Sequence, residues 1–152
     1  MSITRESGTW SKHFMKMALV ASEISKDPST KTGCIIINAK RDIIATGYNG
    51  FPFAIDDKDE WLNDRDMKYA LVIHAETNAI LRTTNRRDLE GAELYCTHYP
   101  CGDCAKNIVQ VGIKKVFYHN RQKLEDGNWA EHYKVSDMIF KQSGVFTKQV
   151  LI

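Results

Sequence analysis

The chain has 152 residues, of which 43% are hydrophobic and 26% are charged, and its formal net charge is +2. This length suits one domain with its own core, so we expect a single domain over residues 1–152. The basic residues are scattered and nearly balanced by acidic ones, so the charge pattern does not indicate a nucleic-acid-binding surface. No apolar run reaches the roughly 20 residues of a membrane helix. Neither nucleic acid nor a membrane is therefore expected as a partner.

The cysteines indicate a reducing compartment. The polar segment 1–10 lacks the apolar stretch of a secretory signal. Without such a signal, reduced thiols or metal ligands are favoured over disulfides. We therefore expect a cytoplasmic protein. Its four cysteines are Cys34, Cys96, Cys101 and Cys104.

Hydrophobic periodicity predicts a helix from about residue 10 to 25, which Asp27-Pro28 ends. Residues 34–37 and 43–46 are typical of two strands, and the turn between them predicts a hairpin. Residues 47–68 are expected to form a long loop or small insertion. Its acidic run, 56–60, is interpreted as solvated surface and not as a metal site. The apolar positions of the first helix are Phe14, Met17, Ala18, Ala21 and Ile24.

Strands and helices alternate in the second half of the chain. A strand, helix and strand joined by short connections imply parallel strands with a right-handed crossover. The expected fold is a three-layer α/β/α sandwich, with a central mixed five-stranded sheet and helices on both faces. The predicted helices are 74–86, 101–111 (ended by Gly112) and about 130–142 (ended by Gly144), and the predicted strands are 93–96, 115–118 and 145–147.

Two short motifs carry the candidate chemistry, His74-Ala75-Glu76 and Pro100-Cys101-Gly102-Asp103-Cys104. A Cys-x-x-Cys pair alone also fits redox chemistry or a structural finger. Joined to an upstream His-x-Glu, it is the signature of zinc-dependent nucleobase deaminases. His74, Cys101 and Cys104 lie at two predicted helix starts, where the positive dipole end favours thiolates. Three protein ligands leave the fourth tetrahedral position to water, as in a catalytic zinc site.

Glu76 is interpreted as a proton shuttle and not as a ligand, because two thiolates already neutralise Zn²⁺. In the expected reaction Glu76 takes a proton from zinc-activated water, which attacks the amine-bearing carbon of the base. Glu76 then delivers protons to the ring nitrogen and to the departing ammonia. The alternative is a structural zinc with a fourth ligand, for which Cys34, Cys96 and His98 are the candidates. A structural finger would not need Glu76.

From about residue 10 to 149 the chain resembles deoxycytidylate (dCMP) deaminases of the cytidine deaminase superfamily. The zinc motif is common to that superfamily, whereas the Gly47–Pro52 and His74–Ile80 stretches point to dCMP. Ser25-Lys26-Asp27-Pro28 and Gly112–Val116 extend the resemblance. It implies hydrolysis of dCMP to dUMP for thymidylate synthesis, with dCTP as a further candidate substrate. It also implies one catalytic Zn²⁺ per chain, a homo-hexamer activated by dCTP and inhibited by dTTP, and Mg²⁺ with the regulatory nucleotide.

The resemblance implies substrate contacts as well. Asn49 would contact the deoxyribose hydroxyl, although Asn49-Gly50 also fits a plain turn. The backbone N–H of Ala75 would meet the carbonyl region of the base. Tyr99 would stack on the base, or it would serve as a core aromatic residue.

A phosphate dianion in a pocket needs donors or cations. Ser25, Lys26 and Lys31 are the nearest candidates by motif, and each also fits solvated surface. Phe53-Ala54 stands where the family usually has a glycine, which changes a loop path that requires positive φ. The response to dCTP and dTTP is therefore in doubt. No cysteine or histidine lies between Pro52 and His74, so a second, structural zinc is not expected.

Two rival functions stay open. One is deamination of another cytosine or adenine substrate on the same zinc site. The other is a catalytically silent, zinc-stapled binding module, whose mark would be the loss of Glu76.

Overall fold

The computed structural model describes residues 3–121 and 127–152. Five strands form one mixed sheet in the order β2-β1-β3-β4-β5. β1 runs antiparallel to β2 and β3, whereas β3, β4 and β5 are parallel to one another. The predicted hairpin and the predicted parallel strand pair are both confirmed. The strands are β1 (Gly33–Ile37), β2 (Ile43–Tyr48), β3 (Glu93–His98), β4 (Lys115–Asn120) and β5 (Phe146–Gln149).

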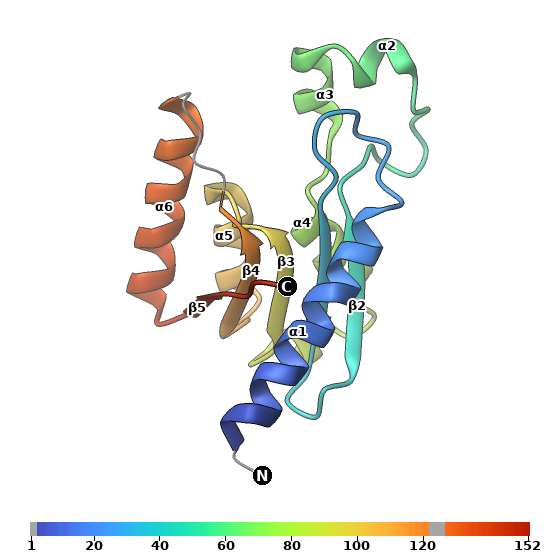
Figure 1. The fold of residues 1–152 in the computed structure, drawn as a ribbon. Coiled ribbons are helices and arrows are strands. Elements are labelled where there is room, and N and C mark those ends of the chain that lie inside the picture. The colour runs from blue at the N-terminus through green and yellow to red at the C-terminus, as the bar shows by residue number, and fades with distance from the viewer. Residues whose placement is uncertain (1–2, 122–126) are drawn as a thin grey trace.

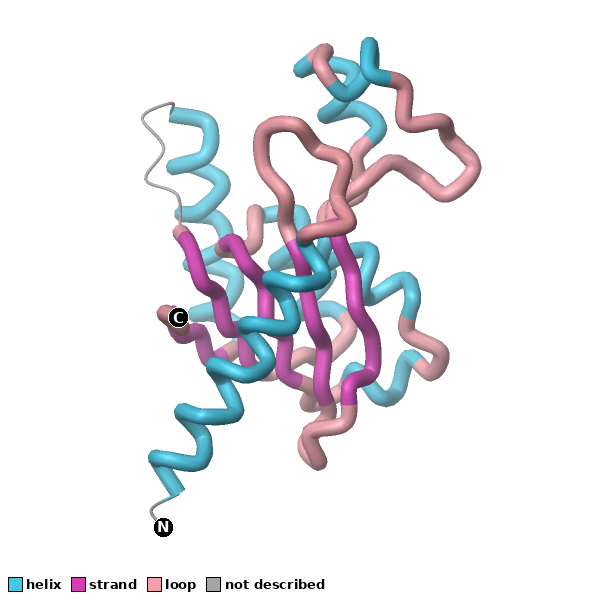
Figure 2. Tube along the Cα trace, turned by 45° about the vertical axis from the view of Figure 1, so that its right-hand side comes forward, coloured by secondary structure: helices cyan, strands magenta, loops and turns pink. Residues whose placement is uncertain are grey.

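Helices cover both faces of this sheet (Figures 1 and 2). Helix α1 (Ile3–Ser22) crosses one face and packs on β1 and β3. On the other face α4 (Ala75–Arg82) packs on β2 and β1, and α5 (Gly102–Gln110) lies between α4 and α6 (Gly127–Ser143). The predicted three-layer α/β/α sandwich is thus confirmed.

Strand β1 shows how the sequence builds the two cores. All five of its residues are buried, and successive side chains point to opposite faces. Cys34 and Ile36 join the apolar cluster under α4 and α5. Ile35 and Ile37 instead pack with Phe14 and neighbouring residues under α1.

The first helix differs from its prediction at both ends. It begins at Ile3 and ends at Ser22, so the chain has already turned away when it reaches Ile24. Ile24 is 64% exposed, and its predicted place on the apolar face was wrong. Met15, which the predicted apolar positions did not include, is completely buried.

The loop prediction for residues 47–68 was partly wrong. β2 continues to Tyr48, and the segment also holds two short helices, α2 (Asp59–Leu62) and α3 (Arg65–Leu71). The Asp64 side chain accepts hydrogen bonds from the backbone N–H groups of Asp66 and Met67, so it caps α3. The acidic residues 56–60 are exposed, as predicted.

Several other boundaries moved by a few residues. α4 ends at Arg82 instead of residue 86, and a 3-10 helix, η1 (Arg86–Leu89), follows it. α6 begins at Gly127, three residues before its predicted start. Gly112 and Gly144 end their helices with φ values of 89° and 74°, as their positions predicted. No helix within the described ranges combines the length and apolar character that crossing a bilayer requires.

Helix α4 lies unusually close to β2, because residue 47 is a glycine. A Cβ atom at Gly47 would lie 2.3 Å from the carbonyl oxygen of Ala75 and 2.6 Å from the backbone nitrogen of Ala79. Any side chain here would force the helix and the strand apart. Gly47 therefore sets the position of α4 on the sheet.

Candidate zinc centre

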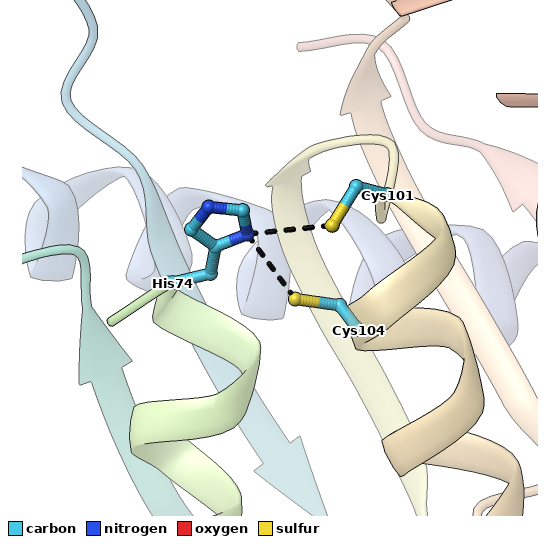
Figure 3. Close-up of side chains that lie close together, drawn as sticks. All are labelled: His74, Cys101 and Cys104. Carbon is cyan, nitrogen blue, oxygen red and sulfur yellow. Dashed lines mark hydrogen bonds between the residues drawn. The ribbon is translucent and has the colours of Figure 1, made fainter. Parts of the chain in front are cut away.

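His74, Cys101 and Cys104 come together where two helices begin. His74 is the N-cap of α4, Cys101 is the N-cap of α5, and Cys104 lies in the first turn of α5. The His74 Nδ1 atom lies 3.4 Å from the Sγ atom of each cysteine. The three candidate ligand atoms are within 4.8 Å of one another, and Figure 3 shows all three side chains converging.

This cluster fits a tetrahedral zinc ion. Zinc bonds of about 2.3 Å to sulfur and 2.0–2.1 Å to nitrogen place such donor atoms about 3.6 Å apart at a tetrahedral angle. The observed 3.4 Å separations need only a small adjustment. One imidazole nitrogen and two thiols are also the donors that zinc prefers.

The proposed fourth ligands of a purely structural site do not join this cluster. The Cys96 thiol donates to a Glu76 carboxylate oxygen, and Cys34 is the strand partner of Cys96. His98 Nδ1 is 3.1 Å from the hydroxyl oxygen of Thr97. Over the described residues, the donor set is therefore three ligands, as in a catalytic zinc site.

The three side chains perturb one another's proton affinity. The hydrogen bond with Cys104, and secondarily His74, lowers the pKa of Cys101. The same thiol pair, together with burial, raises the pKa of Cys104 well above its usual value. A hydrogen bond to Cys101 raises the pKa of His74 to about 9. Metal ligands must release their protons to bind zinc, so the lowered pKa of the Cys101 thiol favours metal binding at this cluster.

Thr77 and Asn107 form a short chain of hydrogen bonds that ends at the Cys104 sulfur. The Thr77 hydroxyl oxygen is 3.7 Å from the Cys104 Sγ atom, and the Asn107 side-chain amide donates to that hydroxyl oxygen at 3.3 Å. Such contacts hold a ligand in one orientation.

Glu76 lies beside the cluster and is only 4% exposed. Its Oε1 atom accepts a hydrogen bond from the Cys96 thiol, with a sulfur–oxygen distance of 2.9 Å. A carboxylate offers about four acceptor positions, so this bond leaves others for reacting groups. The sequence presents Cys96 only as a candidate fourth ligand of a structural zinc and does not predict this contact. The alternation along β3, which turns Cys96 toward the helices that carry the motifs, was the available signal.

A cavity of about 540 Å³ opens over this centre. Its volume is in the range of small-molecule sites. His74, Ala75, Glu76 and Cys101 line it next to the candidate metal position. Further walls come from helices α2 and α3 and from the loop between α1 and β1, with the residues Asp27, Pro28, Ser29, Thr30, Thr32, Asn49, His98, Tyr99 and Tyr133.

Asn49 fastens one wall of this cavity. Its Oδ1 atom accepts a hydrogen bond from the Thr32 backbone N–H at 2.8 Å, and its Nδ2 atom donates to the Thr30 carbonyl oxygen at 2.9 Å. The amide retains one N–H and one acceptor position for a ligand. Gly50 forms a bridge with Ile73, and neither Asn49 nor Gly50 has positive φ. The plain-turn alternative is therefore wrong.

Tyr99 is both a core aromatic residue and part of the cavity wall. Its hydroxyl donates to an Asp137 carboxylate oxygen at 2.5 Å, and Arg121 pairs with the same carboxylate. The rings of Tyr118 and Tyr133 each form a T-shaped contact with the ring of Tyr99. These contacts support the core interpretation. Stacking on a base stays a prediction, because the ring also lines the cavity.

The three residues expected to meet a phosphate do not line this cavity. Ser25 is buried, and its hydroxyl donates to the Asn49 carbonyl oxygen at 2.9 Å. Lys26 pairs with Asp57 and its side chain is 68% exposed. Lys31 is exposed as well. The lysine and arginine that do line the cavity are Lys68 and Arg65, both from α3.

The sequence of this chain is similar to those of known deaminases. Residues 8–120 match the family model described as the cytidine and deoxycytidylate deaminase zinc-binding region. An uncharacterised deaminase of Aliivibrio fischeri is 40% identical over 136 residues, which cover 90% of each chain. The deoxycytidylate deaminase of Mus musculus is 38% identical over 141 residues, which cover 90% of this chain and 76% of the mouse protein.

Solved structures agree with the sequence relatives. The dCMP deaminase of cyanophage S-TIM5 in its apo form superposes with a TM-score of 0.71 at 30% identity, covering 93% of this chain and 97% of the phage chain. The same phage enzyme in complex with dCMP and dUMP gives a TM-score of 0.71 at 28% identity, covering 98% of each chain.

Proposed function

The chain belongs to the cytidine and deoxycytidylate deaminase family, and we propose that it hydrolyses dCMP to dUMP and ammonia. The observation that carries the proposal is the His74-Cys101-Cys104 cluster beside the buried Glu76, inside one cavity. The curated mouse deoxycytidylate deaminase and the phage dCMP deaminase support the choice of substrate.

Zinc, when bound to His74, Cys101 and Cys104, supplies a Lewis acid that lowers the pKa of water. Glu76 accepts the proton of the water that attacks the amine-bearing carbon, C4, of the cytosine ring. Glu76 passes this proton to the ring nitrogen N3, then takes the proton of the new C4 hydroxyl and delivers it to the amino group, which leaves as ammonia and restores the carboxylate. Burial of Glu76 keeps bulk water from competing for these proton transfers.

The other contacts of the substrate follow the cavity wall. The Ala75 backbone N–H, at the first position of α4, is proposed to donate to the carbonyl oxygen of the base. Asn49 is proposed to bind the deoxyribose hydroxyl with the N–H that its loop contacts leave available. In this arrangement Asn49 orders the 30–32 loop and binds the sugar at the same time.

A side-by-side assay of dCMP, dCTP, CMP and deoxycytidine tests the proposed function. We expect the highest kcat/KM with dCMP. A clear preference for deoxycytidine, for a triphosphate or for another base would refute dCMP as the substrate, while the zinc chemistry would stand. Absence of turnover with every substrate would favour the silent zinc-stapled module.

Cys96 is proposed to position Glu76, because its thiol donates to Oε1 and so fixes the carboxylate plane. We expect Cys96→Ala to lower kcat about tenfold, while KM and zinc content stay unchanged. Cys96→Ser keeps a donor and is expected to restore most of the activity. Steady-state kinetics and metal analysis measure these effects.

Cys34→Ala is the matched control, because Cys34 is equally buried opposite Cys96, whereas the hydrogen bond to Glu76 comes from the Cys96 thiol. It removes the same sulfur volume from the same apolar cluster. Equal loss of kcat in Cys34→Ala and Cys96→Ala would show that packing, and not the hydrogen bond, matters.

The remaining family properties stay predictions for this chain: a homo-hexamer, activation by dCTP, inhibition by dTTP, Mg²⁺ with the effector, and a role in thymidylate supply. Repeating the dCMP assay with added dCTP or dTTP tests the regulation. Phe53 is fully exposed in the loop where the family glycine is missing, and a hydrogen bond from the Ile55 backbone N–H to the Pro52 carbonyl oxygen at 2.9 Å closes this loop.

A further inference from the structure

Helix α6 packs directly against the segment that carries the two cysteines of the zinc centre. Figure 1 shows α5 and α6 side by side on one face of the sheet. A Cβ atom at Gly102, the residue after Cys101, would lie 3.2 Å from the Cγ1 atom of Val135 in α6. Tyr133, from the same helix, lines the cavity over the zinc centre. The helix is therefore close enough to act on the metal ligands.

The buried face of α6 has a serine between two aromatic residues. Tyr133, Ser136 and Phe140 follow one another at helical spacing, and all three are buried. A buried hydroxyl group needs a hydrogen-bond partner. The Ser136 Oγ atom lies 2.8 Å from the carbonyl oxygen of Pro100 and 3.0 Å from that of His132. The shorter of these bonds ties α6 to the residue just before Cys101.

A second serine of α6 shows what an ordinary helical serine does. Serine in a helix often bonds the carbonyl oxygen four residues earlier, and that contact alone would satisfy Ser136. The Ser143 hydroxyl donates to the carbonyl oxygens of Ile139 and Phe140, at 2.7 Å and 3.2 Å, within its own helix. Ser136 differs because its hydroxyl also reaches Pro100, outside the helix. Comparing the two serines separates a bond within α6 from a bond to the metal-binding segment.

A second contact from α6 holds the residue before Pro100. The Tyr99 hydroxyl donates to the carboxylate of Asp137, the neighbour of Ser136, at 2.5 Å. The backbone N–H of Tyr99 donates to the Asn120 carbonyl oxygen at 2.8 Å, which ties the same residue to β4. Proline at position 100 stiffens the segment further, because its ring fixes φ. Residues 99 and 100 are therefore held from α6 and from β4 together.

We propose that α6 positions the zinc ligand Cys101, through the bond from Ser136 to the Pro100 carbonyl group. That carbonyl group and the Cys101 N–H belong to one planar peptide unit, so holding the first orients the second. The Cys101 Sγ atom depends on this orientation to stay 3.4 Å from the His74 Nδ1 atom. Groups that hold a metal ligand in one orientation commonly change metal affinity about 10- to 100-fold when they are removed. The inference depends on the zinc centre, whichever nucleotide the chain deaminates.

Zinc affinity, measured by competition with a chromophoric chelator, tests this positioning role. We expect Ser136→Ala to raise the zinc Kd about tenfold. Tyr99→Phe removes only the hydroxyl that bonds Asp137, and we expect it to raise the zinc Kd about threefold, the effect of one modest hydrogen bond. Each substitution should also lower the Tm of the zinc-loaded protein more than the Tm of the protein in excess chelator. A serine with a merely structural role would lower both Tm values equally.

Ser143→Ala and Tyr95→Phe are the matched controls. The first removes a hydroxyl that is bonded within α6. The second removes the hydroxyl of a buried tyrosine that packs under α1, on the opposite face of the sheet. Both controls should leave the zinc Kd at the wild-type value.

An unchanged zinc Kd in Ser136→Ala, or equal decreases of its two Tm values, would overturn the proposal. If Ser136→Ala does not fold, the same two measurements on Tyr99→Phe decide the question. Failure of the wild-type protein to bind zinc would remove the zinc centre itself and the proposal with it. A wild-type protein that binds zinc but prefers a substrate other than dCMP would refute the proposed function alone, so the two failures are distinguished.

Discussion

Glu76→Gln is expected to retain about one zinc per chain and to lose at least about 10²-fold in kcat, the usual contribution of a general acid or base. Glutamine has nearly the same size, and its amide oxygen can still accept the Cys96 hydrogen bond. It cannot carry a proton between water and the base. Single-turnover kinetics with dCMP, together with zinc analysis, measure the two quantities separately.

Glu23→Gln is the matched control, because Glu23 is an exposed carboxylate just after α1. It should leave both zinc content and turnover at the wild-type level. Near wild-type kcat in Glu76→Gln would refute the proton-transfer role. Loss of zinc in that variant would instead place Glu76 among the ligands.

Cys104→Ala is expected to lose zinc and stability together. Its sulfur is one of three donors, it is buried, and Thr77 and His74 contact it. Zinc present at about a hundred times its Kd stabilises the folded protein by about 2.7 kcal/mol, and a variant that no longer binds zinc loses this stabilisation. At this chain length that corresponds to a decrease of roughly 5–10 °C in Tm. Metal analysis and thermal unfolding, with and without a chelator, test this.

Cys34→Ala again serves as the control, since it removes a buried thiol that is outside the metal cluster. The chelator should lower the Tm of wild type and of Cys34→Ala, but it should hardly affect Cys104→Ala. An unchanged ratio of zinc to protein in Cys104→Ala would contradict the ligand assignment.

The zinc centre was accessible from the sequence because its geometry is local. His74 and Cys101 each cap a helix, and Cys104 follows Cys101 by three residues on the same turn. Short spacing of this kind fixes which side chains share a helix end. The alternation of strands and helices likewise predicted the sheet, since parallel strands require a crossover.

Helix α3 and its two cations escaped prediction for a physical reason. The helix has seven residues, no buried side chain and an Asp64 cap inside a polar stretch, so it shows almost no hydrophobic periodicity. Its conformation depends on contacts with a distant segment, such as Lys68 with Asp27. The Ser25-Lys26-Asp27-Pro28 motif suggested Lys26 as a phosphate contact, but Lys26 forms an ion pair with Asp57.

The contacts that tune the site join residues far apart in the chain. Cys96 and Glu76 are twenty positions apart in the sequence. Asn49, which follows β2, forms hydrogen bonds with the backbone of Thr30 and Thr32, which precede β1. Such pairings follow from strand register and from the packing of α4, which no local pattern encodes.

The close approach at Gly47 limits how this chain can vary. His74 and Glu76 lie at the start of α4, which packs this close to β2 because residue 47 is a glycine. A methyl group at residue 47 therefore displaces the metal ligand and the proton carrier together. In a map of mutational tolerance, residue 47 would then rank with the zinc ligands, although it has no side chain to bind anything. Intolerance to substitution in this family member therefore identifies residues that set the spacing of the backbone as well as residues that take part in the chemistry. Measuring what the substituted protein still binds distinguishes the two kinds of residue.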